Sequence, residues 1–271
     1  MLGRTGRQVT LLGLGGEWVL RTFGRDGEAS ALIERALDRG IAYCESARAY
    51  AGSEAYYGKT LRERRKEVFL ASKSHARDRE GALAHLRETL SNLRTDHLDL
   101  WQVHDVRTEQ DISEIFGKGG AIEAFAEAKR QGLARSIGVT GHHDPGVLRE
   151  CIERFDFDTV LMPVNPAETG PAGFLDQVLP VARRRNMGII GMKVYFRGLA
   201  RGLPWYQDMG PFLRFALSQP VTTVVIGCDS IGQLEENAGF ARAFVPMSAD
   251  EQQQLVAAVA PFARQLRYYR A

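Results

Sequence analysis

The chain alternates short apolar runs with longer amphipathic segments eight times, and this alternation limits the possible folds more than any other feature. The apolar runs are rich in β-branched residues and are bounded by turn residues or charges, as buried strands are. We expect strands at residues 9–15, 41–46, 68–73, 98–103, 136–141, 159–165, 188–193 and 222–227. A repeated strand–helix alternation predicts a parallel sheet, and eight units in 271 residues favour a closed (β/α)8 TIM barrel over an open sheet.

Amphipathic patterns between these runs predict helices at residues 28–39, 80–93, 121–131, 145–154, 175–184 and 231–243. Several of these segments end in glycine or in basic residues, and Asp144 can cap a helix whose first residue is Pro145. A further helix, from about Ala249 to Leu266, is expected to pack outside the barrel. No linker or low-complexity segment divides the chain, so residues 1–271 are expected to form a single barrel domain.

The charge balance gives no support to a role on nucleic acids or membranes. Lys and Arg number 35 against 33 Asp and Glu, which leaves a formal charge of +2, and no block of like charge stands out. No apolar run approaches the length of a membrane span, and the first residues lack an apolar core with a cleavage site, so the cytoplasm is the expected compartment. Cys44, Cys151 and Cys228 lie far apart in the sequence, which suggests neither a disulfide framework nor a zinc site.

Four ionisable side chains stand at the ends of three consecutive strands, where the active sites of barrels lie. Glu45 and Tyr50 follow the second strand, Lys73 ends the third, and His104 follows the fourth. A phenol, with a pKa of about 10, is a useful general acid near neutral pH only if a neighbour favours its phenolate. A lysine ammonium group does so, and a carboxylate holds that ammonium in place. With His104 orienting the substrate oxygen, this set predicts protonation of a carbonyl group and therefore needs a hydride donor.

A lysine at the end of a barrel strand also supports a Schiff-base aldolase. Lys73 and Lys193 both meet that requirement. The aldolase interpretation gives no role to Tyr50 or to the eighth strand–helix unit, so carbonyl reduction is preferred.

Nearly the whole sequence resembles the aldo-keto reductase family, through motifs of different types that occur in the family's order. Residues 2–16 resemble the family's opening, residues 40–54 its Gly-Ile-x-Phe/Tyr-x-Asp-Thr-Ala-x-x-Tyr-Gly-x-Ser-Glu block, and residues 68–73 and 98–104 its lysine and histidine strands. The segment GQLEENA resembles its cofactor-binding helix.

The resemblance places the family's catalytic Asp, Tyr, Lys and His on Glu45, Tyr50, Lys73 and His104. It implies a bacterial-type reductase of an aldehyde or ketone, or a dehydrogenase that oxidises the corresponding alcohol or sugar. A nicotinamide cofactor would lie across the barrel mouth, and Tyr50 would supply the proton.

Glu45 departs from this pattern, because the family's acid is normally aspartate. Glutamate keeps the charge and adds one methylene group, so it can still neutralise Lys73 from a displaced backbone or with a bent side chain. Because catalytic groups must be held within fractions of an ångström, the substitution bears directly on activity. Retained catalysis is the preferred interpretation, and a cofactor-binding regulatory or partner protein with weakened catalysis is the alternative.

The family resemblance also assigns the nicotinamide end of the cofactor site. Thr140 stands where the family has a serine, Gly141 replaces its asparagine, and Asn165 matches the amide that is expected to bond the carboxamide. Met192 stands where an aromatic residue usually stacks on the nicotinamide, and a thioether is polarisable enough to cover a ring face. Lys193, Arg197 and backbone N–H groups of their loop are expected to engage the pyrophosphate, unless this is simply an exposed basic loop.

The eighth unit matches the segment that cradles the adenosine in the family. Gly227, Asp229 and Gln233 occupy positions where the family often places a base against the ribose 2′-phosphate, and Glu236 and Asn237 keep the adenine-side pattern. A carboxylate near a ribose accepts hydrogen bonds from its hydroxyl groups and repels a phosphate. The resemblance therefore implies NADP(H), whereas Asp229 favours a relaxed preference or NAD(H).

Two further groups of residues bear on the substrate pocket and on metal binding. Trp18, Trp101 and Trp205, with Phe23, can line an apolar or sugar-stacking substrate pocket, although tryptophans serve equally in packing. His142 or His143 can compensate for the missing asparagine. No metal is expected at residues 142–144, because adjacent side chains should project apart and Asp144 has a capping role.

Overall fold

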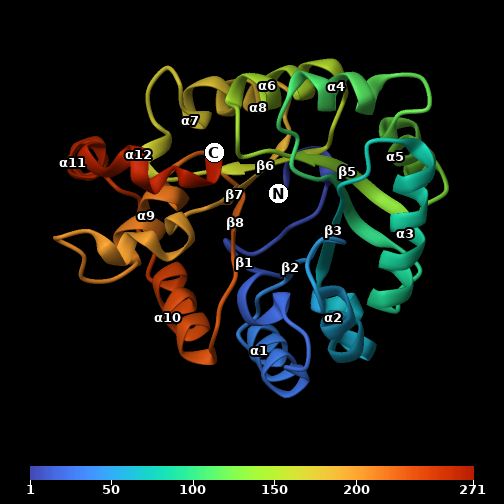
Figure 1. The fold of residues 1–271 in the computed structure, drawn as a ribbon. Helices are drawn as coiled ribbons and strands as arrows, with labels where there is room; N and C mark the ends of the chain where they lie inside the picture. The colour runs from blue at the N-terminus through green and yellow to red at the C-terminus, as the bar shows by residue number, and fades with distance from the viewer.

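Eight parallel strands close into a barrel in the computed structural model, which describes residues 1–271. They are β1 (Leu12–Gly15), β2 (Tyr43–Glu45), β3 (Phe69–Ser74), β4 (Leu98–Val103), β5 (Ala134–Thr140), β6 (Thr159–Pro163), β7 (Gly188–Met192) and β8 (Thr223–Ile226). Each strand pairs with the next, and β8 closes on β1 with Ile226 opposite Leu14. Figure 1 shows this ring of strands inside a ring of helices. The (β/α)8 barrel predicted from the alternation is confirmed.

The outer layer consists of helices that follow the strands in turn. They are α1 (Asp26–Asp38), α2 (Ser53–Leu61), α3 (Arg79–Leu93), α4 (Glu109–Phe116), α5 (Ala121–Arg130), α6 (Pro145–Arg154), α7 (Phe174–Gln177), α8 (Leu179–Arg184), α9 (Gly210–Ser218), α10 (Ile231–Arg242), α11 (Ala249–Val259) and α12 (Ala263–Leu266). Short 3-10 helices are η1 (Gly3–Thr5), η2 (Trp18–Arg21), η3 (Arg62–Glu67), η4 (Pro166–Glu168), η5 (Phe196–Gly202), η6 (Ala260–Phe262) and η7 (Tyr268–Arg270). As expected, Asp144 caps α6, accepting bonds from the N–H groups of Gly146 and Val147.

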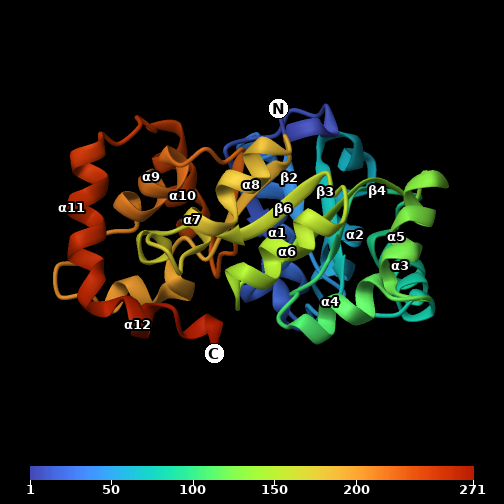
Figure 2. The ribbon, with the colours of Figure 1, turned by 90° about the horizontal axis from the view of Figure 1, so that it is seen from above.

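Two of the expected helices are interrupted at prolines. The segment 175–184 forms α7 and α8, with Pro180 in the first turn of α8. The segment 249–266 forms α11, η6 and α12, with Pro261 inside η6. Proline has no backbone N–H and its ring displaces the preceding turn, so a continuous helix cannot run through it undisturbed. In both views of the ribbon, α11 lies at the outer edge of the molecule (Figures 1 and 2).

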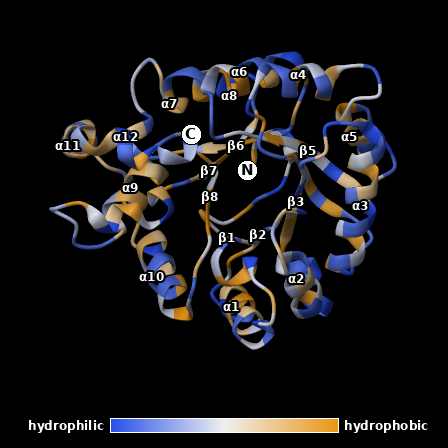
Figure 3. Cartoon of the chain, in the orientation of Figure 1, coloured by the Kyte–Doolittle hydropathy of each residue, from blue (hydrophilic) through white to orange (hydrophobic).

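The apolar residues form two layers of core. The interior of the barrel holds a small cluster made of Leu2, Tyr43, Phe69, Ala71, Leu100, Leu161 and Ile190. A much larger cluster fills the space between the outer faces of the strands and the apolar faces of the helices. Figure 3 shows hydrophobic positions turned toward the strands and hydrophilic ones turned outward. The strands are thus buried on both faces, as expected for a parallel sheet covered by helices.

The two chain ends lie at opposite ends of the barrel axis (Figure 2). Leu2 is fully buried against the N-terminal end of β7, close to Gly188. The last residues reach the other end, where Tyr269 contacts Asn165 just after β6. No helix has both the length and the apolar character that crossing a bilayer requires.

Candidate active site

A buried ion pair joins the carboxyl ends of β2 and β3. Oε1 of Glu45 lies 2.7 Å from the Lys73 ammonium nitrogen, and the two side chains expose only 4% and 1% of their surface. The same nitrogen donates to the backbone carbonyl of Ser46 at 2.9 Å. A buried charge pair is tolerated only when its remaining hydrogen-bonding capacity is met, and these contacts meet part of it. The structure therefore brings the predicted acid and lysine together.

The second oxygen of Glu45 explains how a glutamate is accommodated. Oε2 accepts hydrogen bonds from the Tyr43 hydroxyl at 2.7 Å and from the Gln102 amide at 3.0 Å. Tyr43 lies two residues earlier on β2, so its side chain has the same direction as that of Glu45. Gln102 lies on β4, two strands away, opposite Lys73 in the register of β3 with β4. The longer side chain spans this width and fixes one carboxylate between three partners.

Tyr50 and His104 lie beside this pair. Tyr50 is in the loop after β2, and its ring meets the His104 ring edge-on, with centroids 5.7 Å apart and planes at 82°. The Lys73 ammonium lies 5.0 Å from the centre of the tyrosine ring, and the Arg21 guanidinium lies 4.9 Å from it. Both cations are within the range of favourable attraction to an aromatic face. All four groups predicted to be catalytic thus lie together.

The environment keeps both rings neutral around neutral pH. Burial raises the pKa of Tyr50 well above its usual value, and the carboxylates of Glu17 and Glu45 add to this effect. Burial lowers the pKa of His104 well below its usual value, as does the Lys73 charge. Nδ1 of His104 is buried and has no hydrogen-bond partner. The sequence argument required Lys73 to favour the phenolate of Tyr50. In this structure burial has the largest effect on the Tyr50 pKa, and it favours the protonated phenol.

A cleft of about 830 Å³ opens over these residues at the carboxyl ends of the strands. Its walls include the predicted catalytic set and most of the predicted cofactor set: Glu45, Tyr50, Lys73, His104, Thr140, Met192, Lys193, Arg197, Gly227, Asp229, Gln233, Glu236 and Asn237. Trp18 also lines the cleft. The volume lies within the range of small-molecule and cofactor sites.

The loop after β7 forms the basic part of this wall. Lys193 and Arg197 both have φ angles near +55°, a left-handed conformation that residues other than glycine seldom adopt. Strain of this kind is frequent at ligand sites. The Lys193 ammonium and the Arg197 guanidinium each lie 3.9 Å from a carboxylate oxygen of Glu17. Burial alone would raise the pKa of Glu17, but these cations lower it, so the carboxylate stays charged.

The start of α10 forms the far end of the cleft. The Asp229 N–H donates to Oε1 of Gln233 at 2.9 Å, and the Ser230 hydroxyl caps the helix. The Asp229 side chain is exposed. Asn237 is held from behind, because its Oδ1 accepts a bond from the Tyr195 hydroxyl at 2.7 Å. The segment predicted to bind the adenosine therefore presents the exposed carboxylate of Asp229 and the amide of Asn237, which Tyr195 holds in place.

Besides Phe23, whose side chain is exposed, three predicted residues do not lie on the cleft wall. Trp101 is fully buried on the outer face of β4, stacked on Phe125 with ring centroids 3.7 Å apart. Its neighbour Gln102 takes the inward direction, because successive strand residues point to opposite faces. Trp205 stacks on Phe212 instead.

Asn165, the third of these residues, has its amide engaged elsewhere. Its Nδ2 donates to the Lys193 carbonyl at 3.1 Å and to the Tyr269 hydroxyl at 2.9 Å. Its Oδ1 accepts from the Ala167 N–H, and the side chain is fully buried. The structure thus gives Asn165 a bracing role between the loop after β7 and the chain end.

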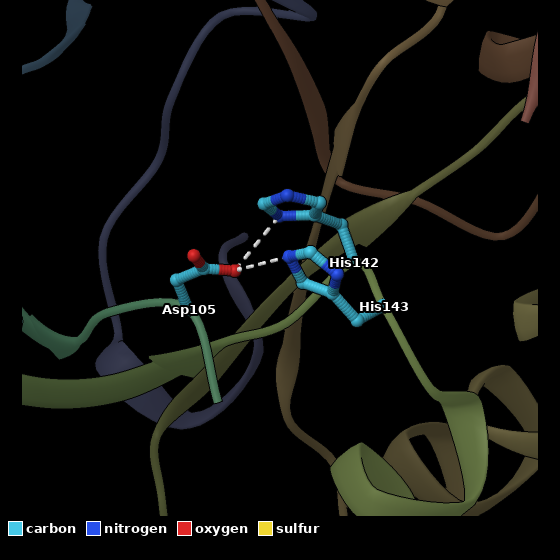
Figure 4. Close-up of side chains that lie close together, drawn as sticks. All are labelled: Asp105, His142 and His143. Carbon is cyan, nitrogen blue, oxygen red and sulfur yellow. Dashed lines mark ion pairs between the residues drawn. The ribbon is translucent and has the colours of Figure 1, made fainter. Parts of the chain in front are cut away.

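His142 and His143 do not project apart, and that part of the sequence argument was wrong. Their ring centroids lie 4.4 Å apart, and both rings face Asp105 (Figure 4). They follow the last residue of β5 in a bend, where the alternation of a strand no longer applies. Burial and the nearby Lys193 lower the pKa of His142 to about 3. Next to them, the Thr140 hydroxyl accepts a bond from the Asp105 N–H at 2.8 Å.

Several residues that shape the site were not anticipated from the sequence. Arg21 and Glu17 reach the cleft from the loop after β1, and Arg77 donates to the carbonyl groups of His104 and Asp105, at 2.8 Å each. No motif marked them. Gln102 did carry a signal, because it stands two residues before His104 on a strand already assigned to the site.

The comparisons with known proteins show which family the chain belongs to. The model of the aldo/keto reductase family matches residues 11–204. The chain belongs to this family. The recognition made from the motifs is confirmed, and this aldo/keto reductase is an oxidoreductase whose chemistry is NAD(P)H-dependent carbonyl reduction in general.

Relatives resemble this aldo/keto reductase along most of its length. A Bacillus subtilis protein named as the uncharacterized oxidoreductase YqkF is 24% identical over 291 residues, covering 89% of this chain and 90% of that protein. The holo structure of an aldo-keto reductase from Bacillus halodurans is similar with a TM-score of 0.80, at 24% identity and 95% coverage of both chains. A Klebsiella pneumoniae aldo-keto reductase solved in complex with NADPH has a TM-score of 0.77 at 21% identity, covering 91% of this chain and 90% of that one. At these identities the structural likeness establishes the fold.

Proposed function

We propose that this aldo/keto reductase reduces an aldehyde or ketone to an alcohol, or runs the reverse reaction, with Tyr50 as the general acid or base. The observation that carries the proposal is the arrangement of Glu45, Lys73, Tyr50 and His104 at one end of a single cleft. A bound reduced nicotinamide supplies the hydride in this chemistry. The carbonyl carbon would accept that hydride, and Tyr50 would give its hydroxyl proton to the carbonyl oxygen.

The electrostatics of the site suit the direction of reduction. A general acid must hold its proton when the substrate arrives, and burial keeps Tyr50 protonated. Release of that proton to the substrate then requires the Lys73 charge to favour the phenolate. His104, neutral because its pKa is lowered, can donate one N–H bond to the substrate oxygen without competing for its proton. The Lys73 charge, fixed by Glu45, stabilises the phenolate that remains after proton transfer.

The same cleft offers residues that fit a dinucleotide. Lys193, Arg197 and the N–H groups of their loop suit a pyrophosphate, and Thr140 and Met192 lie between that loop and His104 as candidates for the nicotinamide end. At the far end, Gly227, Asp229, Gln233, Glu236 and Asn237 would hold the adenosine. A relative of the same fold was solved with NADPH, which supports a nicotinamide cofactor of that kind.

Cofactor preference depends on Asp229 in this proposal. Asp229 is exposed and lines the far end of the cleft, so we expect its carboxylate to face the adenosine ribose, where it would disfavour the 2′-phosphate of NADP(H) and suit the hydroxyl groups of NAD(H). We therefore expect the enzyme to accept NAD(H) at least as readily as NADP(H).

The test is to follow oxidation of NADH and of NADPH with a panel of aldehydes, ketones and aldose sugars, alongside a fluorescence titration of each cofactor. Turnover with at least one carbonyl class, lost in Tyr50→Phe while cofactor binding persists, supports the proposal. Tight cofactor binding without turnover on any member would support the regulatory alternative. The intact Glu45–Lys73 pair argues against that alternative.

A further inference from the structure

Three potential metal ligands converge beside the cleft, on loops that follow adjacent strands. Asp105 comes after β4, and His142 and His143 come after β5. Oδ1 of Asp105 lies 3.1 Å from Nδ1 of His142 and 3.4 Å from Nε2 of His143. One ligand atom from each of the three residues lies within 4.8 Å of the others. Figure 4 shows both rings directed at the same carboxylate oxygen.

The hydrogen bonding of His143 makes two hydrogen-bond acceptors, its own Nε2 and Oδ1 of Asp105, face each other. Nδ1 of His143 lies 3.3 Å from the backbone carbonyl of Arg270, which can only accept, so Nδ1 carries the ring proton. In the neutral ring Nε2 then presents a lone pair, and it faces a carboxylate oxygen. Both Nε2 of His143 and Oδ1 of Asp105 are buried without a hydrogen-bond partner. Two acceptors at this distance require a cation, or an extra proton, between them.

The separations fit a metal ion better than a hydrogen bond. In a tetrahedral zinc site, with bonds of about 2.0–2.1 Å, neighbouring ligand atoms lie roughly 3.3 Å apart. The two measured separations from Oδ1 are 3.1 and 3.4 Å. Neither of these close approaches has the geometry of a hydrogen bond, as expected when both donor lone pairs point to a shared third point rather than at each other.

The ligands are also braced as metal ligands are. Two nitrogens of the Arg107 guanidinium, Nη2 and Nε, donate to Oδ2 of Asp105 at 2.6 and 2.8 Å, which leaves Oδ1 directed at the histidines. Asp105 has a φ of +57°, and this strained backbone is held by Thr140 at its N–H and by Arg77 at its carbonyl. The Arg270 carbonyl orients His143 in the manner of the outer partners that orient ligating histidines.

We infer that Asp105, His142 and His143 form a binding site for one divalent transition-metal ion of the zinc class. The donor set of two imidazole nitrogens and one carboxylate oxygen suits Zn²⁺, Co²⁺ or Fe²⁺ rather than Mg²⁺ or Ca²⁺. Three protein ligands leave a coordination position open, as in catalytic zinc sites. Asp105 and His142 line the cleft, so an ion held by the three residues would lie at its edge. The inference does not rest on the proposed carbonyl reduction.

The test is metal binding by the full chain, measured without reference to activity. Chelator-treated protein is titrated with Zn²⁺ by calorimetry, and with Co²⁺ while its visible d–d absorption is recorded. We expect one ion per chain and the intense Co²⁺ bands of a tetrahedral or five-coordinate site. His142→Ala and His143→Ala should each weaken Zn²⁺ binding by at least roughly 100-fold, beyond the loss caused by removing an outer partner.

A matched control is available in the same cleft. His75 also lines it, and its ring lies 4.5 Å from that of His85, but this second histidine pair does not form a group of three close ligand atoms with a carboxylate. His75→Ala should therefore bind Zn²⁺ as the wild type does, and Asp105→Asn should lose the Co²⁺ bands while keeping its circular dichroism spectrum. Equal Zn²⁺ affinity in the wild type and in the His142→Ala/His143→Ala double variant would overturn the inference and leave the cluster as a proton-sharing ion pair.

Discussion

Gln102 lies directly opposite Lys73 in the pairing of β3 with β4, and their side chains reach the two different oxygens of Glu45. The carboxylate is thereby held across three strands, from β2 to β4. Burying a charge in this position is tolerated because each oxygen has its own partner. Glu45 therefore has two properties that substitution can separate. Its negative charge pairs with Lys73, and its side-chain length lets it bond Gln102 and Tyr43.

Glu45→Gln should lower kcat more than Glu45→Asp. The amide keeps the length but leaves the Lys73 ammonium buried without a counter-charge, which is also expected to destabilise the fold by about 3–5 kcal/mol. Aspartate keeps the charge and gives up the bonds to Tyr43 and Gln102. Steady-state kinetics and thermal melts of both variants make the comparison. If Gln retains the wild-type rate, Glu45 is not the carboxylate that holds Lys73 for catalysis.

Tyr50→Phe should lower kcat by on the order of 10² to 10⁴-fold and leave the cofactor Kd nearly unchanged. The substitution removes the proton donor, whereas the ring contacts with His104, Lys73 and Arg21 persist. Tyr56→Phe is a suitable control, because that hydroxyl bonds the Arg25 N–H away from the cleft. A Tyr50→Phe enzyme as fast as the wild type would remove Tyr50 from the mechanism.

The strand-end residues could be predicted because a parallel barrel gathers the carboxyl ends of its strands at one mouth. Glu45, Lys73 and His104 needed only the positions of three strands. Trp101 could not be placed in the same way, since β4 is buried on both faces and its sequence shows no alternation that distinguishes inside from outside.

The loops were less predictable than the strands. The convergence of His142 and His143 on Asp105 depends on a bend after β5 and on the left-handed backbone of Asp105, neither of which has a sequence signature. The engagement of Asn165 by Tyr269 joins residues 104 positions apart, and it required the path of the last helices. Local patterns carry no information about such long-range contacts.

Asp229→Arg should shift the ratio of kcat/KM values toward NADPH. The exposed carboxylate would be replaced by a guanidinium that can make a charge-assisted contact with the 2′-phosphate. Asp176→Arg changes the net charge equally at an exposed position outside the cleft and should leave the ratio unchanged. An unaltered ratio in Asp229→Arg would mean that the phosphate is bound elsewhere.

Asn165→Ala should lower the melting temperature with and without cofactor by similar amounts. The amide bonds Lys193, Ala167 and Tyr269, so its loss loosens the loop after β7 and the chain end together. Tyr269→Phe removes one of these bonds together with the bond from its hydroxyl to the buried Glu168 carboxylate, so it should also lower the melting temperature. If the cofactor-induced stabilisation disappears in Asn165→Ala while the melting temperature of the unliganded protein is unchanged, Asn165 binds the cofactor directly.

The last prediction concerns the ionisation of Tyr50. Burial, with Glu17 and Glu45, raises its pKa in the folded protein, so it should contribute no phenolate absorbance up to about pH 10, the usual value for tyrosine. Ultraviolet titrations of the wild type and of Tyr50→Phe should therefore coincide below that pH and separate only above it.

A raised pKa of Tyr50 in the folded protein also means that the neutral phenol favours the folded state below about pH 10. This contribution to stability is lost as the pH rises through the pKa of the folded protein. Arg21→Met removes a cation that lowers the pKa, so the separation should then begin at a still higher pH. A phenolate signal from Tyr50 near neutral pH would show instead that Lys73 dominates its ionisation.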